Sequence, residues 1–249
     1  MPHRPSNRMV PGATTAVLMI HGICGSPAHF RTLLPMEKMI PEGWSYHNIV
    51  LDGHCKEVAD FGASSMKKWQ AQVDKVFDEL CSSHDQIILV GHSMGTLLSI
   101  RQALRCPNKV KTLFLLAVPV KVFVQPRAIP YLIRIAFDKI DEKNPVQVSM
   151  RDACGIRQTR MVWKYAPWIP RMVELLRFCS QTAKLVEDLR VPCIAIQSAK
   201  DEMVSSRAGK RLKESGRVEV IDLPNSTHFY YPPEDAMKIL SIFERICKA

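Results

Sequence analysis

The segment Gly91-His92-Ser93-Met94-Gly95 has the form Gly-x-Ser-x-Gly, a pattern that can present a serine as a nucleophile. It follows directly on the apolar run 86–90, which predicts a buried strand, and a helical pattern over residues 96–106 comes after it. A sharp turn between strand and helix would project the Ser93 hydroxyl from the sheet, and the two glycines let neighbouring elements come close. We predict Ser93 as a catalytic nucleophile. The alternative is a glycine-rich turn in which Ser93 only caps the helix.

Four further short motifs occur along the chain, each next to a predicted strand or before the last predicted helix. They are His21-Gly22, Asp52-Gly53-His54, Ala199-Lys200-Asp201-Glu202-Met203-Val204 and Ser226-Thr227-His228. Together with the segment around Ser93 they resemble the α/β-hydrolase family over nearly the whole chain, and most of all its small bacterial carboxylesterases and the related monoacylglycerol lipases. The resemblance implies an α/β-hydrolase fold and hydrolysis of carboxylic esters.

A serine hydroxyl needs a histidine to accept its proton and a carboxylate to hold that histidine in one tautomer. In this fold the partners follow the nucleophile in the order acid, then histidine, and Asp201 and His228 satisfy that order. Asp201 follows the predicted strand 193–197, and His228 lies in the loop before the terminal helix, where it can reach over the sheet. We predict a triad of Ser93, Asp201 and His228. The alternatives are a turn aspartate and a surface-loop histidine.

Two other carboxylates lie close enough in the sequence to compete with Asp201 as the partner of His228. They are Glu202, which we expect to point away from Asp201, and Asp222, which falls inside the predicted strand 218–223. Neither position suits a loop residue that must reach the histidine, so Asp201 remains the predicted acid.

Acyl transfer also needs backbone amides that face the developing oxyanion, and one of them belongs to the residue after the nucleophile, here Met94. The family resemblance implies that Ile23, the residue after the first His-Gly pair, supplies the other amide of this oxyanion hole. We expect His21 to brace that loop by hydrogen bonding rather than to act as a base, and His92 to pack beside the nucleophile. We expect Cys24 to be a small residue in a tight loop rather than a redox group.

The segments between these motifs alternate apolar runs with helical patterns. Strands are predicted at residues 16–20, 46–51, 86–90, 110–118, 193–197 and 218–223. Helices are predicted at residues 27–39, 64–81, 96–106, 205–214 and 233–248. This alternation predicts the α/β class, with a mostly parallel sheet flanked by helices on both faces. Residues 1–12 are polar and rich in proline, and we expect them to form a loose leader.

Residues 120–184 break the alternation, with helical patterns at 131–140 and 170–186 and no clear strand. They contain 12 Lys and Arg against 5 Asp and Glu, so 12 − 5 = +7 of the net charge of +10 lies there. A helical insertion in a parallel sheet usually sits above the carboxyl edge, where ligands bind. We therefore predict a hydrolase core of residues 1–119 and 185–249 and a helical cap of residues 120–184.

The cap contains apolar side chains that can line an acyl pocket, although most of them are expected to form the cap's own core. They are Phe123, Ile129, Tyr131, Leu132, Ile133, Ile135, Met161, Val162, Trp163, Trp168, Ile169, Met172, Leu175 and Leu176. Its basic residues have three interpretations: a solvated outer face, which we favour, a docking surface for an anionic bilayer, or recognition of an acidic group of the substrate.

The composition suits a globular protein of one or two domains. No apolar run is long enough to span a bilayer, the first residues do not resemble a signal peptide, and the eight cysteines include no Cys-x-x-Cys pair. We therefore expect a soluble cytoplasmic protein with reduced cysteines. No histidine grouping predicts a metal site, no glycine-rich phosphate loop predicts a nucleotide cofactor, and no recognised module accompanies the basic charge to predict nucleic-acid binding.

These features predict a serine hydrolase that needs no cofactor and acts on a small-molecule ester. The family resemblance, together with the apolar side chains of the cap, implies that its substrates are esters of short to medium acyl chains or monoacylglycerols, cleaved through an acyl-enzyme. A thioesterase, an amidase or an acyltransferase can use the same triad, because the pocket chooses the acceptor. An alternative of another class is a non-catalytic lipid-binding or partner-binding protein with the same fold.

Overall fold

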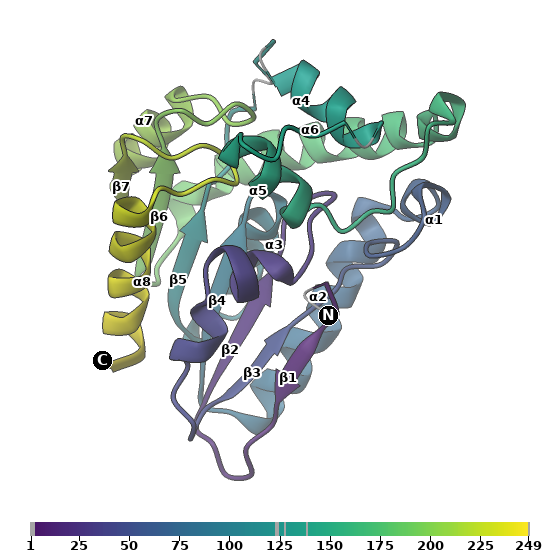
Figure 1. Cartoon of the computed structure of the whole chain (residues 1–249). Helices are drawn as coiled ribbons and strands as arrows, with labels where there is room; N and C mark the ends of the chain where they lie inside the picture. Colours follow the sequence, from purple (N-terminus) through teal and green to yellow (C-terminus); the bar gives the residue numbers. More distant parts are fainter. Residues whose placement is uncertain (1–2, 123–124, 127, 138, 249) are drawn as a thin grey trace.

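The computed structural model describes residues 3–122, 125–126, 128–137 and 139–248. In this part of the chain seven strands form one twisted sheet in the order β1-β3-β2-β4-β5-β6-β7 (Figure 1). The strands are β1 (Ser6–Arg8), β2 (Thr15–Ile20), β3 (Ser45–Asn48), β4 (Gln86–His92), β5 (Val110–Leu116), β6 (Cys193–Ser198) and β7 (Glu219–Leu223). Every neighbouring pair is parallel except β1 with β3. The predicted mostly parallel α/β sheet is therefore confirmed, and β2 to β7 correspond to the six predicted strands.

Helices lie on both faces of this sheet (Figure 1). The α-helices are α1 (Val58–Gly62), α2 (Met66–Ser83), α3 (Met94–Arg105), α4 (Ala128–Ala136), α5 (Pro145–Ala153), α6 (Trp168–Leu185), α7 (Arg207–Glu214) and α8 (Pro233–Lys248). Shorter helical turns are η1 (His29–Leu33), η2 (Met36–Met39), η3 (Pro107–Lys109), η4 (Val162–Tyr165) and η5 (Val186–Asp188). The predicted helices 64–81, 96–106, 205–214 and 233–248 correspond to α2, α3, α7 and α8.

Two sequence predictions about the first forty residues are wrong. The predicted helix 27–39 is instead two short turns, η1 and η2, separated at Pro35. A proline has no N–H to donate and its ring clashes with the preceding turn, which explains the break. The predicted loose leader contains β1, which pairs antiparallel with β3, and the Arg8 guanidinium donates to the Trp44 carbonyl at 3.0 Å. A three-residue edge strand is too short to show an alternating pattern.

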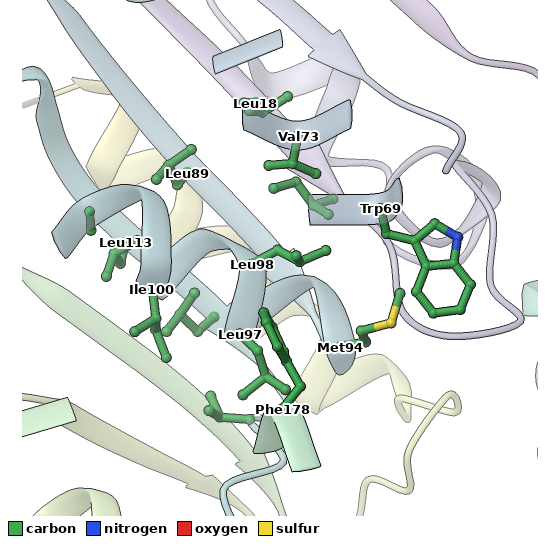
Figure 2. Packing of buried hydrophobic residues seen from close by; sticks show 14 of the residues in the cluster. Leu18, Trp69, Val73, Leu89, Met94, Leu97, Leu98, Ile100, Leu113 and Phe178 are labelled. Carbon is green, nitrogen blue, oxygen red and sulfur yellow. The ribbon is translucent and has the colours of Figure 1, made fainter. Parts of the chain in front are cut away.

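The strands bury both faces because successive side chains point to opposite sides. Ala16 and Leu18 of β2 belong to the hydrophobic cluster under α2, α3 and α6, whereas Val17 and Met19 belong to the cluster under η1, η2 and α8. Figure 2 shows part of the first cluster, with Leu89 and Leu113 of the sheet near α3 and Leu18 beside Val73 of α2. Because helices cover both faces of the sheet, a polar site can lie at the edges of the sheet.

The segment between β5 and β6 contains α4, α5, η4 and α6, and α4 lies beyond the carboxyl ends of the strands (Figure 1). The last α-helix of this segment, α6, also packs into the main core. Leu175, Phe178 and Cys179 of α6 are buried in the same cluster as α3, and Figure 2 shows Phe178 beside Leu97. The later part of α6 is therefore a layer of the main core, while the predicted division of the chain into core and cap stays a prediction.

The contact between α3 and β2 depends on Gly95. A methyl group there would lie 2.8 Å from the carbonyl oxygen of His21 and closer still to that of Ile20, and both are backbone atoms. We expect Gly95→Ala to lower the free energy of unfolding by about 3 kcal/mol, the upper end for overpacked sites, because α3 must move away from the sheet. Urea unfolding measures this change. Gly43→Ala, which would meet no atom within 4 Å, is the control and should unfold as the wild type does. Equal midpoints for the two variants would contradict the prediction.

Candidate active site

Ser93 lies on the turn between the end of β4 and the start of α3, with φ of 51° and ψ of −121°. The turn is fixed on both sides. The Ser93 N–H donates to the Leu116 carbonyl at 2.9 Å, and the Ser93 carbonyl accepts from the N–H and the hydroxyl of Thr96 at 2.9 and 2.7 Å. A non-glycine residue in this left-handed region costs about 1–3 kcal/mol. Such strain is typical of positions where the surrounding fold holds a functional side chain.

Asp201 and His228 form a buried pair at the carboxyl edge of the sheet. Nδ1 of His228 lies 2.8 Å from Oδ2 of Asp201, and each residue is 3% exposed. The other carboxylate oxygen, Oδ1, accepts the N–H groups of Met203 and Val204, both at 2.8 Å. Asp201 follows β6 and His228 lies between β7 and α8, so two loops far apart in the sequence bring the pair together. The carboxylate is held in one orientation by its own loop.

His92 connects this pair to the turn that carries Ser93. Its Nε2 donates to the carbonyl of His228 at 3.1 Å, and its ring centroid lies 4.9 Å from that of the His228 ring. On its other side the His92 ring stacks on His29 at 3.7 Å. Among the described residues no hydrogen bond joins Ser93 Oγ to His228. The structure therefore brings Asp201 and His228 into contact and holds the histidine loop on the residue that precedes Ser93.

The loop that follows β2 passes directly beside Ser93. A methyl group on Gly22 would lie 2.9 Å from Cβ of Ser93, and the Gly25 N–H donates to the Gly22 carbonyl at 3.0 Å, which closes a tight turn. The Ile23 amide donates to no acceptor in the described part of the chain. Met94 is the first residue of α3, a position whose N–H has no partner within the helix. Both predicted oxyanion amides thus belong to backbone that borders Ser93.

Two buried histidines brace this loop. His21 Nε2 accepts the Leu51 N–H at 3.1 Å, so its Nδ1 carries the proton and donates to the Gly22 carbonyl at 2.8 Å. Burial lowers the pKa of His21 to about 4, so the ring is neutral near pH 7. This is the bracing expected from the sequence. His54 Nε2 accepts the Cys24 N–H at 3.2 Å. Sequence reasoning assigned no role to His54, although the Asp52-Gly53-His54 motif contained it.

Glu202 also contacts His228, a role that sequence reasoning missed. Its Oε2 accepts the His228 backbone N–H at 3.2 Å, and its Oε1 is buried with no hydrogen-bond partner among the described residues. Burial raises the pKa of the Glu202 carboxyl above its ordinary value. Asp222, the other competing carboxylate, lies in β7 and pairs with Lys213 at 2.5 Å instead. The carboxylates of the neighbouring residues Asp201 and Glu202 thus bind the ring and the backbone N–H of His228, respectively.

The charges around His228 decide its protonation. Burial by itself lowers the pKa of His228, but the charge of Asp201, the hydrogen bond to it and the charge of Glu202 outweigh burial and raise that pKa above the ordinary 6.5. Burial also lowers the pKa of His29 to about 3 and keeps that of His92 well below 6.5. In this histidine cluster the surroundings therefore favour the protonated form of His228 and disfavour that of His29 and His92.

A raised pKa of His228 predicts the pH dependence of turnover. His228 is the general base predicted from the sequence, and a general base must be neutral to act. On that prediction, kcat/KM should rise with pH through the His228 pKa and fall about tenfold per pH unit below it. Glu202→Gln keeps an acceptor for the His228 N–H but removes a negative charge, which lowers the pKa of His228. We expect the acid limb to move to lower pH, measured by hydrolysis of a p-nitrophenyl ester from pH 5 to 9. Glu219→Gln, an exposed change on β7, is the control. If the acid limb of the pH profile of Glu202→Gln coincided with that of the wild type, this electrostatic account would be contradicted.

The described residues include no group of three or more His, Cys, Asp or Glu side chains placed to hold a metal ion. None of the helices in the described ranges is long and apolar enough to cross a membrane.

The family model described as serine aminopeptidase, S33, matches residues 12–229. The chain therefore belongs to this family of α/β hydrolases, and the predicted α/β-hydrolase fold is confirmed. A comparison with curated protein sequences gives no match.

Solved structures of similar fold include several hydrolytic enzymes. A metagenome-derived lipolytic enzyme from work on LipS and LipT is 20% identical, with a TM-score of 0.72 over 99% of this chain and 98% of its own. The monoacylglycerol lipase of Paleococcus ferrophilus is 15% identical, with a TM-score of 0.68 over 98% of both chains. The thioesterase domain from the curacin biosynthetic pathway is 18% identical, with a TM-score of 0.63 over 98% of this chain and 94% of its own. At these identities the likeness establishes the fold, and the site must be argued from its own residues.

Proposed function

We propose that this protein is a serine hydrolase that cleaves carboxylic esters with Ser93, Asp201 and His228. The observation that carries the proposal is the buried Asp201 and His228 pair, 2.8 Å apart, held by His92 against the strained turn of Ser93. A structural turn would need neither the strain at the serine nor a charged pair buried beside it. Family membership agrees with hydrolysis as the reaction class.

The geometry supports the following sequence of steps. His228 takes the Ser93 hydroxyl proton at Nε2 as Oγ attacks the acyl carbon, and Asp201 stabilises the resulting imidazolium through Nδ1. The amides of Met94 and Ile23 donate to the oxyanion. When the intermediate collapses, His228 gives the proton to the departing alcohol and leaves an acyl-enzyme. His228 then activates a water that releases the acid and restores Ser93.

For the substrate, we propose esters of short to medium acyl chains or monoacylglycerols. Lipolytic enzymes and a monoacylglycerol lipase among the structural neighbours support this class. A thioester substrate is the second candidate, because a thioesterase domain has the same fold and the same acyl chemistry applies. The two differ only in the leaving group that the pocket accepts.

We further propose a cytoplasmic location, supported by the state of the cysteines. All eight are free thiols, and three of them, Cys179, Cys193 and Cys247, are buried. Proteins that keep many unpaired cysteines are typical of reducing compartments.

The test is hydrolysis of a ladder of p-nitrophenyl esters from acetate to palmitate, together with labelling by a fluorophosphonate probe. We expect turnover on part of the ladder and a single labelled residue, Ser93, located by peptide mass spectrometry. The preferred chain length measures the acyl pocket, and parallel assays with acyl-CoA thioesters separate the two substrate classes. No turnover of either class together with no label on Ser93 would overturn the proposed function.

A further inference from the structure

Apolar side chains are exposed in an unusual concentration between residues 160 and 177. In this stretch, which includes η4 and the first half of α6, Trp163 is 69% exposed and Ile169 is 66% exposed. Other large exposed hydrophobic residues of the stretch are Met161, Val162, Val173 and Leu176. We call residues 160–177 the outer patch. Large apolar surfaces left in contact with water are typical of sites that bind a partner or a membrane.

The outer patch is not explained by packing within the chain. Ile169, Val173 and Leu176 recur at intervals of four and three residues, so they lie on one side of α6. A different side of the same helix carries Leu175 and Phe178 into the core beside α3. The helix thus has one apolar side that the fold buries and another that it leaves exposed.

The charges of the outer patch favour one kind of partner. Arg160, Lys164 and Arg177 are exposed and form no ion pair with any described residue. The one acidic residue of the stretch, Glu174, is already paired with Arg171 at 2.6 Å. Cations without partners beside exposed Trp and aliphatic side chains match the boundary of an anionic bilayer, where headgroup phosphates lie next to acyl chains.

We propose that the outer patch docks the protein on the surface of a membrane rich in anionic phospholipid. Trp163, Val162 and the α6 side chains Ile169, Val173 and Leu176 enter the interface, while Arg160, Lys164 and Arg177 contact headgroup phosphates. This docking does not depend on the proposed ester hydrolysis. Helix α6, which carries half of the outer patch, lies at the end of the molecule where the strands of the sheet end (Figure 1), so docking would bring this end close to lipid esters.

The test compares two double variants, each of which replaces an exposed apolar side chain with serine and the lysine that follows it with glutamate. Trp163→Ser with Lys164→Glu alters the outer patch. Met237→Ser with Lys238→Glu alters an exposed hydrophobic residue and an adjacent exposed lysine on α8, which is not part of the patch. Binding is measured by co-sedimentation with vesicles of phosphatidylcholine alone and with vesicles in which about a third of the lipid is phosphatidylserine. Circular dichroism and thermal melting check that both variants fold.

We expect the wild type to bind the anionic vesicles at least ~10-fold more tightly than the neutral ones, and the binding to weaken as salt is raised. The patch variant should lose at least ~20-fold in affinity, since each basic residue near the surface contributes roughly fivefold and Lys164 is reversed in sign. The α8 variant should stay within about twofold of the wild type. Trp163 is 69% exposed and Met237 is 63% exposed, so neither side chain lines an enclosed acyl pocket. Fluorophosphonate labelling and hydrolysis of a soluble ester should therefore be unchanged in both variants, which separates this proposal from the proposed function.

Three results would overturn the proposal. The first is equal binding of the wild type to both kinds of vesicle, and the second is an equal loss in both variants, which would indicate a general effect of charge. The third is self-association of the wild type in light scattering that the patch variant abolishes, without binding to vesicles. In that case the outer patch contacts a second copy of the chain.

Discussion

Hydrolysis of p-nitrophenyl esters is expected to fall at least ~10³-fold in Ser93→Ala, because no other group at this turn can form the acyl-enzyme. The loss should appear in kcat and in kcat/KM alike, since the oxyanion amides and the acyl pocket remain. The fold should survive the change. Ser93 Oγ makes no hydrogen bond with a described residue, and alanine keeps the same backbone constraints at the turn. Activity is measured at the best chain length of the ester ladder.

The matched control for this variant is Ser241→Ala, which removes an exposed hydroxyl on α8 that bonds only to the Lys238 carbonyl at 2.9 Å. It should keep full turnover. If Ser93→Ala retained a tenth or more of the wild-type rate while folding normally, Ser93 would not be the nucleophile and the catalytic proposal would fail.

The second large effect is expected in Asp201→Asn, with a loss of about 10⁴ in kcat. The reason lies in the hydrogen bonds of the two carboxylate oxygens. Oδ1 accepts the N–H groups of Met203 and Val204, so the asparagine carbonyl must take that place and its NH₂ must face His228. An NH₂ can only donate, which forces Nδ1 of His228 to accept and moves the proton to Nε2. A histidine protonated at Nε2 cannot take the proton of Ser93.

Asp222→Asn serves as the control. Asp222 is an aspartate on the neighbouring strand β7, and it pairs with Lys213 at the surface. Its turnover should match that of the wild type. The ¹⁵N and ¹H NMR signals of the His228 ring report the tautomer directly. Nearly full activity in Asp201→Asn would show that another carboxylate, with Glu202 the nearest, holds the histidine.

Much of the fold could be predicted from the sequence, because its signals are local. The run 86–90 has no polar residue after its first, and a buried parallel strand is the structure that such a run favours. The run 16–20 is apolar throughout, and 193–197 is apolar up to its last residue, Gln197. The turn at Ser93 follows from the two glycines around it. Helices α2 and α8 are long enough for their apolar period to be clear.

The parts that the sequence did not predict are short or depend on contacts between distant segments. Strand β1 has three residues and owes its existence to β3, and α1 has five. Helix α5 was missed although Asn144 and Pro145 form a standard helix start, because its apolar residues Val146, Val148 and Met150 recur at every second position, as in a strand. The placement of Glu202 against the His228 backbone requires two loops to meet, and no pattern within either loop encodes that distance. The triad itself remains a prediction that the variants above will decide.

Helix α6 limits how this enzyme can be redesigned. One way to change substrate choice is to exchange the segment above the predicted active site for that of a relative. The predicted cap, residues 120–184, would set the limits of this exchange between β5 and β6. A replacement of that whole stretch would remove Leu175, Phe178 and Ala183 from the cluster that they form with α3 and leave a cavity in the main core. A graft that ends before Trp168 would exchange the part of the predicted cap that precedes α6. The contacts of α6 with the main core would stay as they are. The chain therefore offers a smaller exchangeable module than its sequence suggests.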